Sequence, residues 1–223
     1  MPQTSADRAV LLPIYLVCDL SSSMREGGRA DALHDALTAL RDTIWANPVV
    51  SDYARIGVIG FSGQASVLLP LCDLAMADEL PALTPDGLTS YAAVFRLLRR
   101  TLREDGTQLT GDGFRVWRPL VFFVSDGEPT DRPEEWRAEL AALLDESTPT
   151  RPEIVGFAVG EARSATLAGI ATARCFVART GVAVREAIEE IGDVVIRSVV
   201  SSSLAGRPAV PAAPPGFDEL DLL

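Results

Sequence analysis

Lysine is absent from this sequence of 223 residues, and all 20 of its basic residues are arginine. A phosphate-cradling P-loop requires a lysine, as do Schiff-base enzymes and kinase-type ATP sites. The missing lysine therefore excludes these chemistries. The formal net charge of −11 argues against nucleic acid and anionic membranes as partners, because binding to phosphates needs clustered cations.

Histidine and cysteine are scarce. His34 is the one histidine, and its place within a predicted helix argues against a Ser-His-Asp triad. Cys18, Cys72 and Cys175 lie far apart without any CxxC spacing, so we expect no zinc site. Cys18 and Cys175 stand in apolar runs and are interpreted as buried small hydrophobes, which suits a reducing cytoplasm.

Long apolar segments are missing as well. No uninterrupted apolar run is long enough to span a bilayer. Residues 9–20 contain Pro13, end near Asp19 and lack both a clustered positive start and a small-residue cleavage site, so we expect no signal peptide. These features predict a cytoplasmic protein without a membrane contact.

Short apolar runs alternate with stretches of helical periodicity. Residues 14–19 are typical of a strand buried on both faces, and residues 29–46 place apolar side chains at gaps of three and four. This alternation predicts an α/β fold of the Rossmann-like kind, with a mostly parallel central sheet and helices on both faces. Further strands are expected at 54–63, 65–71, 120–125, 153–160 and 174–178, and further helices at 74–80, 91–103, 133–145, 164–171 and 184–203.

Three connecting features complete this prediction. The strands within 54–71 are expected to form a hairpin that gives the sheet one antiparallel edge strand. Residues 105–117 are rich in glycine and polar side chains and predict a surface loop. Asp131 and Glu134 have the spacing of a capping box for the helix that follows.

The chain is expected to contain one domain at 10–204, after an N-terminal extension at 1–9. Residues 205–223 are rich in proline and acidic side chains, so they are interpreted as a tail that is a linker or disordered.

Oxygen-bearing side chains follow two of the predicted strands. Asp19, Ser21 and Ser23 come directly after the first strand, and Asp126 ends the strand at 120–125. Because parallel strands end at the same edge of a sheet, we expect these side chains to converge there. The loop at 84–90 supplies a further hydroxyl, that of Thr89.

Hydroxyls and carboxylates are hard ligands that suit Mg²⁺, with Mn²⁺ and Ca²⁺ as alternatives. Neutral hydroxyls offset the charge of such an ion only in part. The ion should therefore attract an acidic group from a partner protein to complete its shell, which is a mode of recognition and not a reaction.

The set Asp19, Ser21, Ser23, Thr89 and Asp126 resembles the metal-ion-dependent adhesion site (MIDAS) of von Willebrand factor A domains. The order of strands and helices resembles that fold over about 10–204. The resemblance implies that these five residues coordinate a divalent ion, with Asp126 acting directly or through a water. Leu88 and Ala92 stand where that family commonly has glycine.

The stretch RPLVFFVSDGEPTD at 118–131 is similar to the TerY-like, tellurium-resistance branch of this family. That similarity implies a non-enzymatic module in bacterial stress signalling, with a kinase, a phosphatase or other stress-response proteins as partners. Glu128 and Asp131 lie near the expected ion and are interpreted as capping charges that could tune it.

Two alternatives to this function stay open. A metal-free scaffold could bind partners through its helix faces or through the acidic and apolar end at 217–223. A metal-dependent phosphohydrolase of the haloacid-dehalogenase type would need a second aspartate where Ser21 stands, and usually a lysine.

Overall fold

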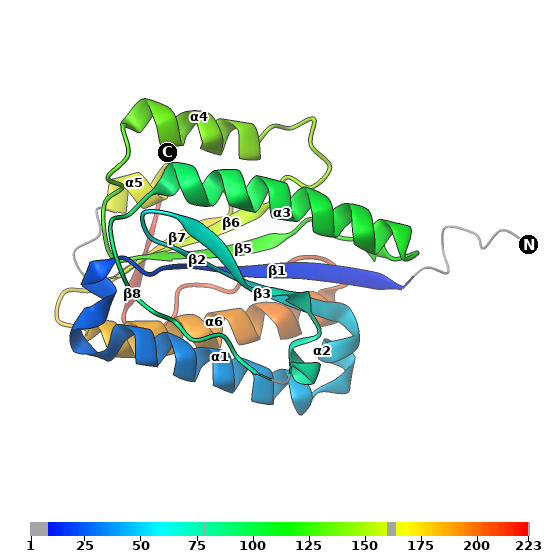
Figure 1. Cartoon of the computed structure of the whole chain (residues 1–223). Helices are drawn as coiled ribbons and strands as arrows, with labels where there is room; N and C mark the ends of the chain where they lie inside the picture. Colours follow the sequence, from blue (N-terminus) through cyan, green and yellow to red (C-terminus); the bar gives the residue numbers. More distant parts are fainter. Residues whose placement is uncertain (1–8, 78, 160–163, 223) are drawn as a thin grey trace, which may run out of the picture.

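The computed structural model describes residues 9–77, 79–159 and 164–222, which build one mixed sheet covered by helices (Figure 1). The strands follow the order β3-β2-β1-β5-β6-β7-β8, and β4 pairs with β1 outside this path. Their bounds are β1 Val10–Asp19, β2 Ala54–Phe61, β3 Ala65–Cys72, β4 Arg115–Val116, β5 Leu120–Ser125, β6 Glu153–Ala158, β7 Arg174–Ala178 and β8 Phe217–Leu220.

The centre of the sheet is parallel. Strand β1 lies between β2 and β5 and is parallel to both, and β5, β6 and β7 continue in the same direction. Strand β3 runs antiparallel to β2 at one edge, as the predicted hairpin requires. The predicted fold class is confirmed, and β8 adds a second antiparallel edge strand beside β7.

Helices cover both faces of this sheet (Figure 1). One face carries α1, α2 and α6, and the other carries α3, α4 and α5. Pro48 occupies the first turn of α2, so the proline that ends α1 also starts the next helix. The bounds are α1 Arg29–Trp45, α2 Pro48–Tyr53, α3 Tyr91–Gly111, α4 Pro133–Leu143, α5 Ser164–Ala168 and α6 Val184–Ala205, with short 3₁₀ turns η1 Ser22–Gly28 and η2 Leu74–Met76.

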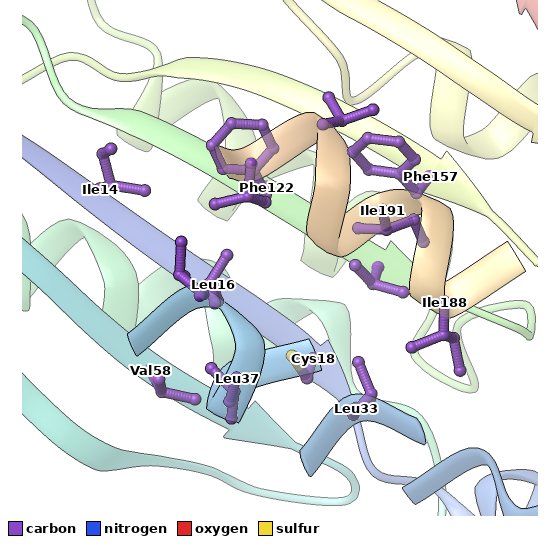
Figure 2. Packing of buried hydrophobic residues seen from close by; sticks show 14 of the residues in the cluster. Ile14, Leu16, Cys18, Leu33, Leu37, Val58, Phe122, Phe157, Ile188 and Ile191 are labelled. Carbon is purple, nitrogen blue, oxygen red and sulfur yellow. The ribbon is translucent and has the colours of Figure 1, made fainter. Parts of the chain in front are cut away.

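Strand β1 is buried on both sides because its side chains alternate between two apolar cores. Leu16 and Cys18 pack toward α1 and α6, where they meet Leu37 and Ile188 (Figure 2). Tyr15 and Val17 point to the opposite core, under α3 and α4. The continuous apolar run of the sequence is thus explained by two faces of burial.

Helix α3 is longer than predicted. The expected loop at 105–117 is wrong, because residues 104–111 continue the helix and Arg115–Val116 form β4. Gly106 is buried where the helix passes close to Thr150; a Cβ atom on Gly106 would lie 2.7 Å from the Thr150 methyl carbon. Tertiary packing therefore keeps a glycine inside a helix, against its intrinsic propensity.

The end of the chain is ordered in part. The prediction of a linker or disordered segment is wrong for Phe217–Leu220, which form β8 and pair with β7. Phe217 is 1% exposed, and its ring lies 5.9 Å from that of Phe157. Gly206 ends α6 in a left-handed conformation and turns the chain back toward the sheet. The division of the chain at residues 9 and 204 stays a prediction.

Within the described residues, no helix combines the length and the apolar character that crossing a bilayer requires.

Candidate functional site

The first part of the site is the turn after β1. Asp19 is fully buried at the end of this central strand, and its Oδ1 accepts a hydrogen bond from the backbone N–H of Ser21 at 2.9 Å. This bond closes the turn and leads the chain into η1. The hydroxyl oxygens of Ser21 and Ser23 consequently lie 3.0 Å apart on the same side of the turn.

The second part comes from β5, the neighbour of β1. Asp126 follows the last residue of this strand and is 5% exposed. The Ser23 hydroxyl donates to Asp126 Oδ1 at 2.7 Å, across 103 residues of sequence. The convergence of the two strand ends, which the sequence predicted, is therefore present in the structure.

Thr89 approaches the same edge from the loop before α3. Its side chain is 6% exposed, and its hydroxyl oxygen lies 3.9 Å from the position that a Cβ atom on Gly127 would take. The Thr89 carbonyl accepts hydrogen bonds from the backbone N–H and the hydroxyl of Thr130, at 2.8 and 2.9 Å. These bonds fasten the Thr89 loop to the segment that follows Asp126.

Two residues outside the predicted ligand set support this arrangement, and the sequence assigned no role to either. The Ser125 hydroxyl donates to Asp19 Oδ2 at 2.7 Å, and the Tyr91 hydroxyl donates to Ser125 Oγ at 3.0 Å. All three side chains are buried, so they form one internal chain of hydrogen bonds. The only signal in the sequence was the place of Ser125 directly before Asp126 at the end of a strand.

Asp131 has a different role from the predicted one. Its carboxylate accepts hydrogen bonds from the Ala92 backbone N–H at 2.8 Å and from the Ser90 hydroxyl at 2.9 Å. The N-cap of α4 is Arg132, without a side-chain hydrogen bond. The predicted capping box with Glu134 is therefore wrong, and Asp131 instead fixes the start of α3 beside the Thr89 loop.

The electrostatics of the site centre on Asp19. Burial raises the pKa of this carboxyl, the hydrogen bonds from Ser125 and Ser21 lower it, and the nearby Asp126 raises it again. In the described part of the chain, its hydrogen-bond partners are hydroxyls and one backbone N–H, and none is a cation. A buried carboxylate without a positive partner is costly, so the site favours the arrival of a cation.

Glu128 brings a further carboxylate near this site. Its Oε2 accepts a hydrogen bond from the Thr166 hydroxyl at 2.9 Å, whereas its Oε1 is buried without a hydrogen-bond partner. The negative charges of Asp19, Glu128 and Asp126 all act to raise the pKa of Tyr91, although burial is the largest cause. The edge of the sheet therefore gathers negative charge around neutral hydroxyls.

The donor set fits a hard divalent ion. Mg²⁺ binds oxygen at about 2.1 Å in octahedral geometry, so adjacent ligand oxygens lie about 3 Å apart. The separations of 3.0 Å between the two serine hydroxyls and 2.7 Å between Ser23 and Asp126 are close to this value. No three His, Cys, Asp or Glu side chains form a metal-holding group among the described residues, so any ion here depends on hydroxyl ligands.

Comparison with known protein families identifies the fold that carries this site. The family model of the von Willebrand factor type A domain matches residues 14–128, which is more than half of the chain. The chain belongs to this family. The match begins within β1 and ends just after Asp126, so it contains both strand ends and the Thr89 loop.

Solved structures with a similar fold come from distant organisms. They include a von Willebrand factor type A protein from Catenulispora acidiphila, at 14% identity and a TM-score of 0.55, covering 84% of this chain and 43% of that chain. The D319A mutant of the PilB minor pilin from Streptococcus sanguinis matches at 10% identity and a TM-score of 0.57, covering 92% of this chain and 65% of that one.

Proximal thread matrix protein 1 from the mussel byssus, with a zinc-occupied MIDAS motif, matches at 17% identity and a TM-score of 0.56. The match covers 86% of this chain and 48% of the mussel chain. At these identities the likeness concerns the fold alone, and this chain spans 43% to 65% of the length of the three structures. No curated protein matches the chain.

Proposed function

We propose that this A domain is a non-enzymatic, metal-dependent protein-binding module. In this proposal Asp19, Ser21, Ser23, Thr89 and Asp126 hold a divalent cation, and an acidic residue of a partner protein completes its shell. The observation that carries the proposal is the buried Asp19 carboxylate, which has hydroxyl partners, a second carboxylate nearby and no cationic hydrogen-bond partner in the described chain. The oxygen spacing around Ser23 supports it further.

The ion we expect is Mg²⁺, with Mn²⁺ and Ca²⁺ as alternatives, because all the donors are hard oxygen atoms. When bound, it supplies positive charge at the strand ends, to which a carboxylate of the partner is attracted. The zinc-occupied MIDAS motif of the mussel protein supports a divalent cation at this edge of the fold. Asp19 holds the ion from the central strand, while Ser125 and Tyr91 keep its carboxylate oriented.

The finer assignment is to TerY-like stress signalling in the bacterial cytoplasm, with kinases, phosphatases or other stress-response proteins as partners. It rests on the resemblance of residues 118–131 alone. The non-enzymatic character rests on the residues present: the chain has no lysine, its one histidine is exposed on α1, and Ser21 occupies the position where a phosphohydrolase needs a second aspartate.

Titration calorimetry with Mg²⁺, Mn²⁺ and Ca²⁺ tests the metal site most directly. Ser21→Ala removes a proposed ligand, and Ser22→Ala removes a hydroxyl that lies next to it but donates outward to the Gly87 carbonyl. We expect Ser21→Ala to weaken metal binding about tenfold or more, and Ser22→Ala to leave it within about twofold. Equal affinities for both variants would contradict the proposed ligand set.

Capture of partners from a native extract, with Mg²⁺ and with chelator, tests the role of the ion in recognition. Proteins retained equally in both conditions, and equally by an Asp19→Ala, Ser21→Ala variant, would favour the metal-free scaffold. Loss of that binding in a protein shortened after residue 205 would assign the scaffold role to the end of the chain, provided that the shortened protein stays monomeric, because β8 covers the edge of β7.

A further inference from the structure

A groove rich in arginine lies along α3, the helix that begins just after Thr89. It has a volume of about 460 Å³ and runs between α3 and the turn that joins β2 to β3. Four of its lining residues are arginines of α3, in a protein whose formal net charge is −11. They are Arg96, Arg99, Arg100 and Arg103.

These arginines are neutralised only in part. Arg96 and Arg99 both pair with Glu139 of α4, at 2.9 and 3.3 Å, and their side chains stay 65% and 46% exposed. Arg100 and Arg103 are exposed and form no ion pair within the described chain. One carboxylate therefore serves two of the four cations, and Glu104 is the acidic neighbour of Arg103 in sequence.

A second groove also contains four arginines, so the number of arginines alone does not set the groove on α3 apart. It lies near the starts of β5 to β7. Arg118, Arg151 and Arg174 there each pair with a different glutamate, at 3.9, 3.3 and 2.8 Å. Most positive charge in that groove is locally compensated, whereas the groove on α3 keeps an excess.

The groove on α3 leads away from the edge of the sheet that carries the candidate ion site. Helix α3 begins two residues after Thr89, at the end of the sheet where β1 finishes (Figure 1). The Ser90 backbone N–H donates to the Ser62 carbonyl at 2.7 Å, and the Ser62 backbone N–H donates to the Gln64 carbonyl at 2.7 Å. These bonds place Gln64, which lines the groove, near the start of α3. A segment that runs from this edge of the sheet along α3 therefore passes the groove.

The geometry points to this groove as the docking surface for an acidic segment of the partner protein. The inference rests on the proposed function, because the segment that docks here is the same partner segment whose carboxylate reaches the ion. Guanidinium groups bind carboxylates through paired hydrogen bonds, which suits glutamate and aspartate side chains of a peptide. Guanidinium groups pair with phosphates as well, but the proposed function already brings a carboxylate of a partner protein to the edge where α3 begins, so an acidic protein segment is the occupant that this groove fits.

Helix geometry sets the spacing of the acidic residues in that segment. Arg96 and Arg103 lie five and twelve residues after Tyr91, or about 8 and 18 Å along the helix axis. An extended peptide advances about 3.3 Å per residue. The acidic side chains that meet these arginines therefore lie about two to six residues from the part of the segment beside the start of α3.

A labelled peptide of ten glutamates tests this assignment by fluorescence anisotropy, with a glycine–serine peptide of equal length as the uncharged probe. Wild type is compared with Arg100→Gln, Arg103→Gln and with a control, Arg41→Gln, Arg197→Gln. The control removes the same charge from α1 and α6, on the opposite face of the sheet. We expect the groove variant to bind the acidic peptide about tenfold more weakly and the control to stay within about twofold of wild type.

Running every titration in Mg²⁺ and in chelator separates the two proposals. Arginine-dependent binding that is equal in both conditions would support the groove and contradict the metal-dependent function. Metal-dependent binding that the groove variant retains would support the function and overturn the groove. Absence of peptide binding by wild type overturns the groove as well.

A single-stranded DNA probe of ten nucleotides tests whether the groove binds nucleic acid instead of a protein segment. If it binds more tightly than the glutamate peptide, with the same dependence on Arg100 and Arg103, the acidic protein segment is the wrong ligand. If it binds more weakly than the peptide, the assignment to protein carboxylates stands. Circular dichroism of each variant confirms that the helix is retained, because both substitutions lie on its exposed surface.

Discussion

Two carboxylates at or beside β1 accept hydrogen bonds from hydroxyls, and they differ in what surrounds them. Asp105 of α3 accepts one hydrogen bond, from the Tyr15 hydroxyl at 2.6 Å, and is half-buried. Asp19 is fully buried, is held by Ser125, and has Asp126 close by. A single carboxylate bound to a hydroxyl, as at Asp105, is a structural hydrogen bond, whereas the convergence of several oxygen-bearing side chains around Asp19 is what distinguishes the candidate site.

The largest difference between Asp19 and Asp105 is expected in the affinity for a divalent ion. Asp19→Asn should weaken divalent-ion binding at least about a hundredfold, because it removes the charge of the central ligand. Asp105→Asn, which changes the same chemical group at the other position, should leave the affinity unchanged. Calorimetry with Mg²⁺ or Mn²⁺ measures both, and similar losses in the two variants would remove the distinction.

Stability without metal should change by different amounts at the two positions. We expect Asp19→Asn to stabilise the metal-free protein by about 1–2 kcal/mol, since it removes a buried negative charge that has no cationic partner. Asp105→Asn should change the free energy of unfolding in the same sense but by less than about 1 kcal/mol, because Asp105 is half-exposed and solvent screens its charge. Urea unfolding in chelator gives both free energies; a destabilised Asp19→Asn would mean that the apo carboxylate is better compensated than the hydrogen bonds indicate.

The hydroxyl donors provide a matched pair of deletions. Ser125→Ala should weaken metal binding about tenfold, because Asp19 loses the donor that orients it. Tyr15→Phe deletes the equivalent donor to Asp105 and should lower the free energy of unfolding by about 1 kcal/mol, with unchanged metal affinity. Measuring both quantities on both variants separates orientation of a ligand from ordinary stabilisation, and a metal effect of Tyr15→Phe would contradict the separation.

The smallest effect concerns pH. Burial raises the pKa of Asp105 above its ordinary value of 3.8, the Tyr15 hydrogen bond lowers it, and Glu104 raises it. The folded state thus holds this proton more tightly, so the contribution is fully present below about pH 4 and is lost as the pH rises through the folded pKa. The loss should stay below about 1 kcal/mol, because solvent screens this half-exposed group. Unfolding of Asp105→Asn from pH 4 upward should lack this decline, whereas parallel curves would refute it.

The central part of the fold and of the site could be predicted because the signals are local. The apolar run before Asp19 and the one before Asp126 each specify a buried parallel strand, and parallel strands end at one edge. The Ser125 and Tyr91 hydrogen bonds join residues 34 and 106 positions apart, and no pattern in a single sequence reports such pairs.

The predictions that the structure contradicts concern segments where tertiary packing overrides the local preference of the sequence. Residues 104–111 contain glycine and polar side chains, but the helix continues because its buried face packs under the neighbouring segment around Thr150. Asp131 had the spacing of one helix cap and instead serves another helix, 39 residues earlier in the chain. The prolines of the final segment predicted disorder, but Phe217 packs against Phe157 in the hydrophobic core.

Strand β8 has a practical consequence for handling the protein. The outer edge of β7 would otherwise offer a row of unpaired N–H and C=O groups to the strands of other molecules. Arg174 and Arg179 on β7 and just beyond it pair with Glu219 and Asp218 at 2.8 Å, which fixes β8 along this edge. A version of the protein shortened after residue 204 would lose β8, so the exposed edge of β7 would promote strand exchange and aggregation.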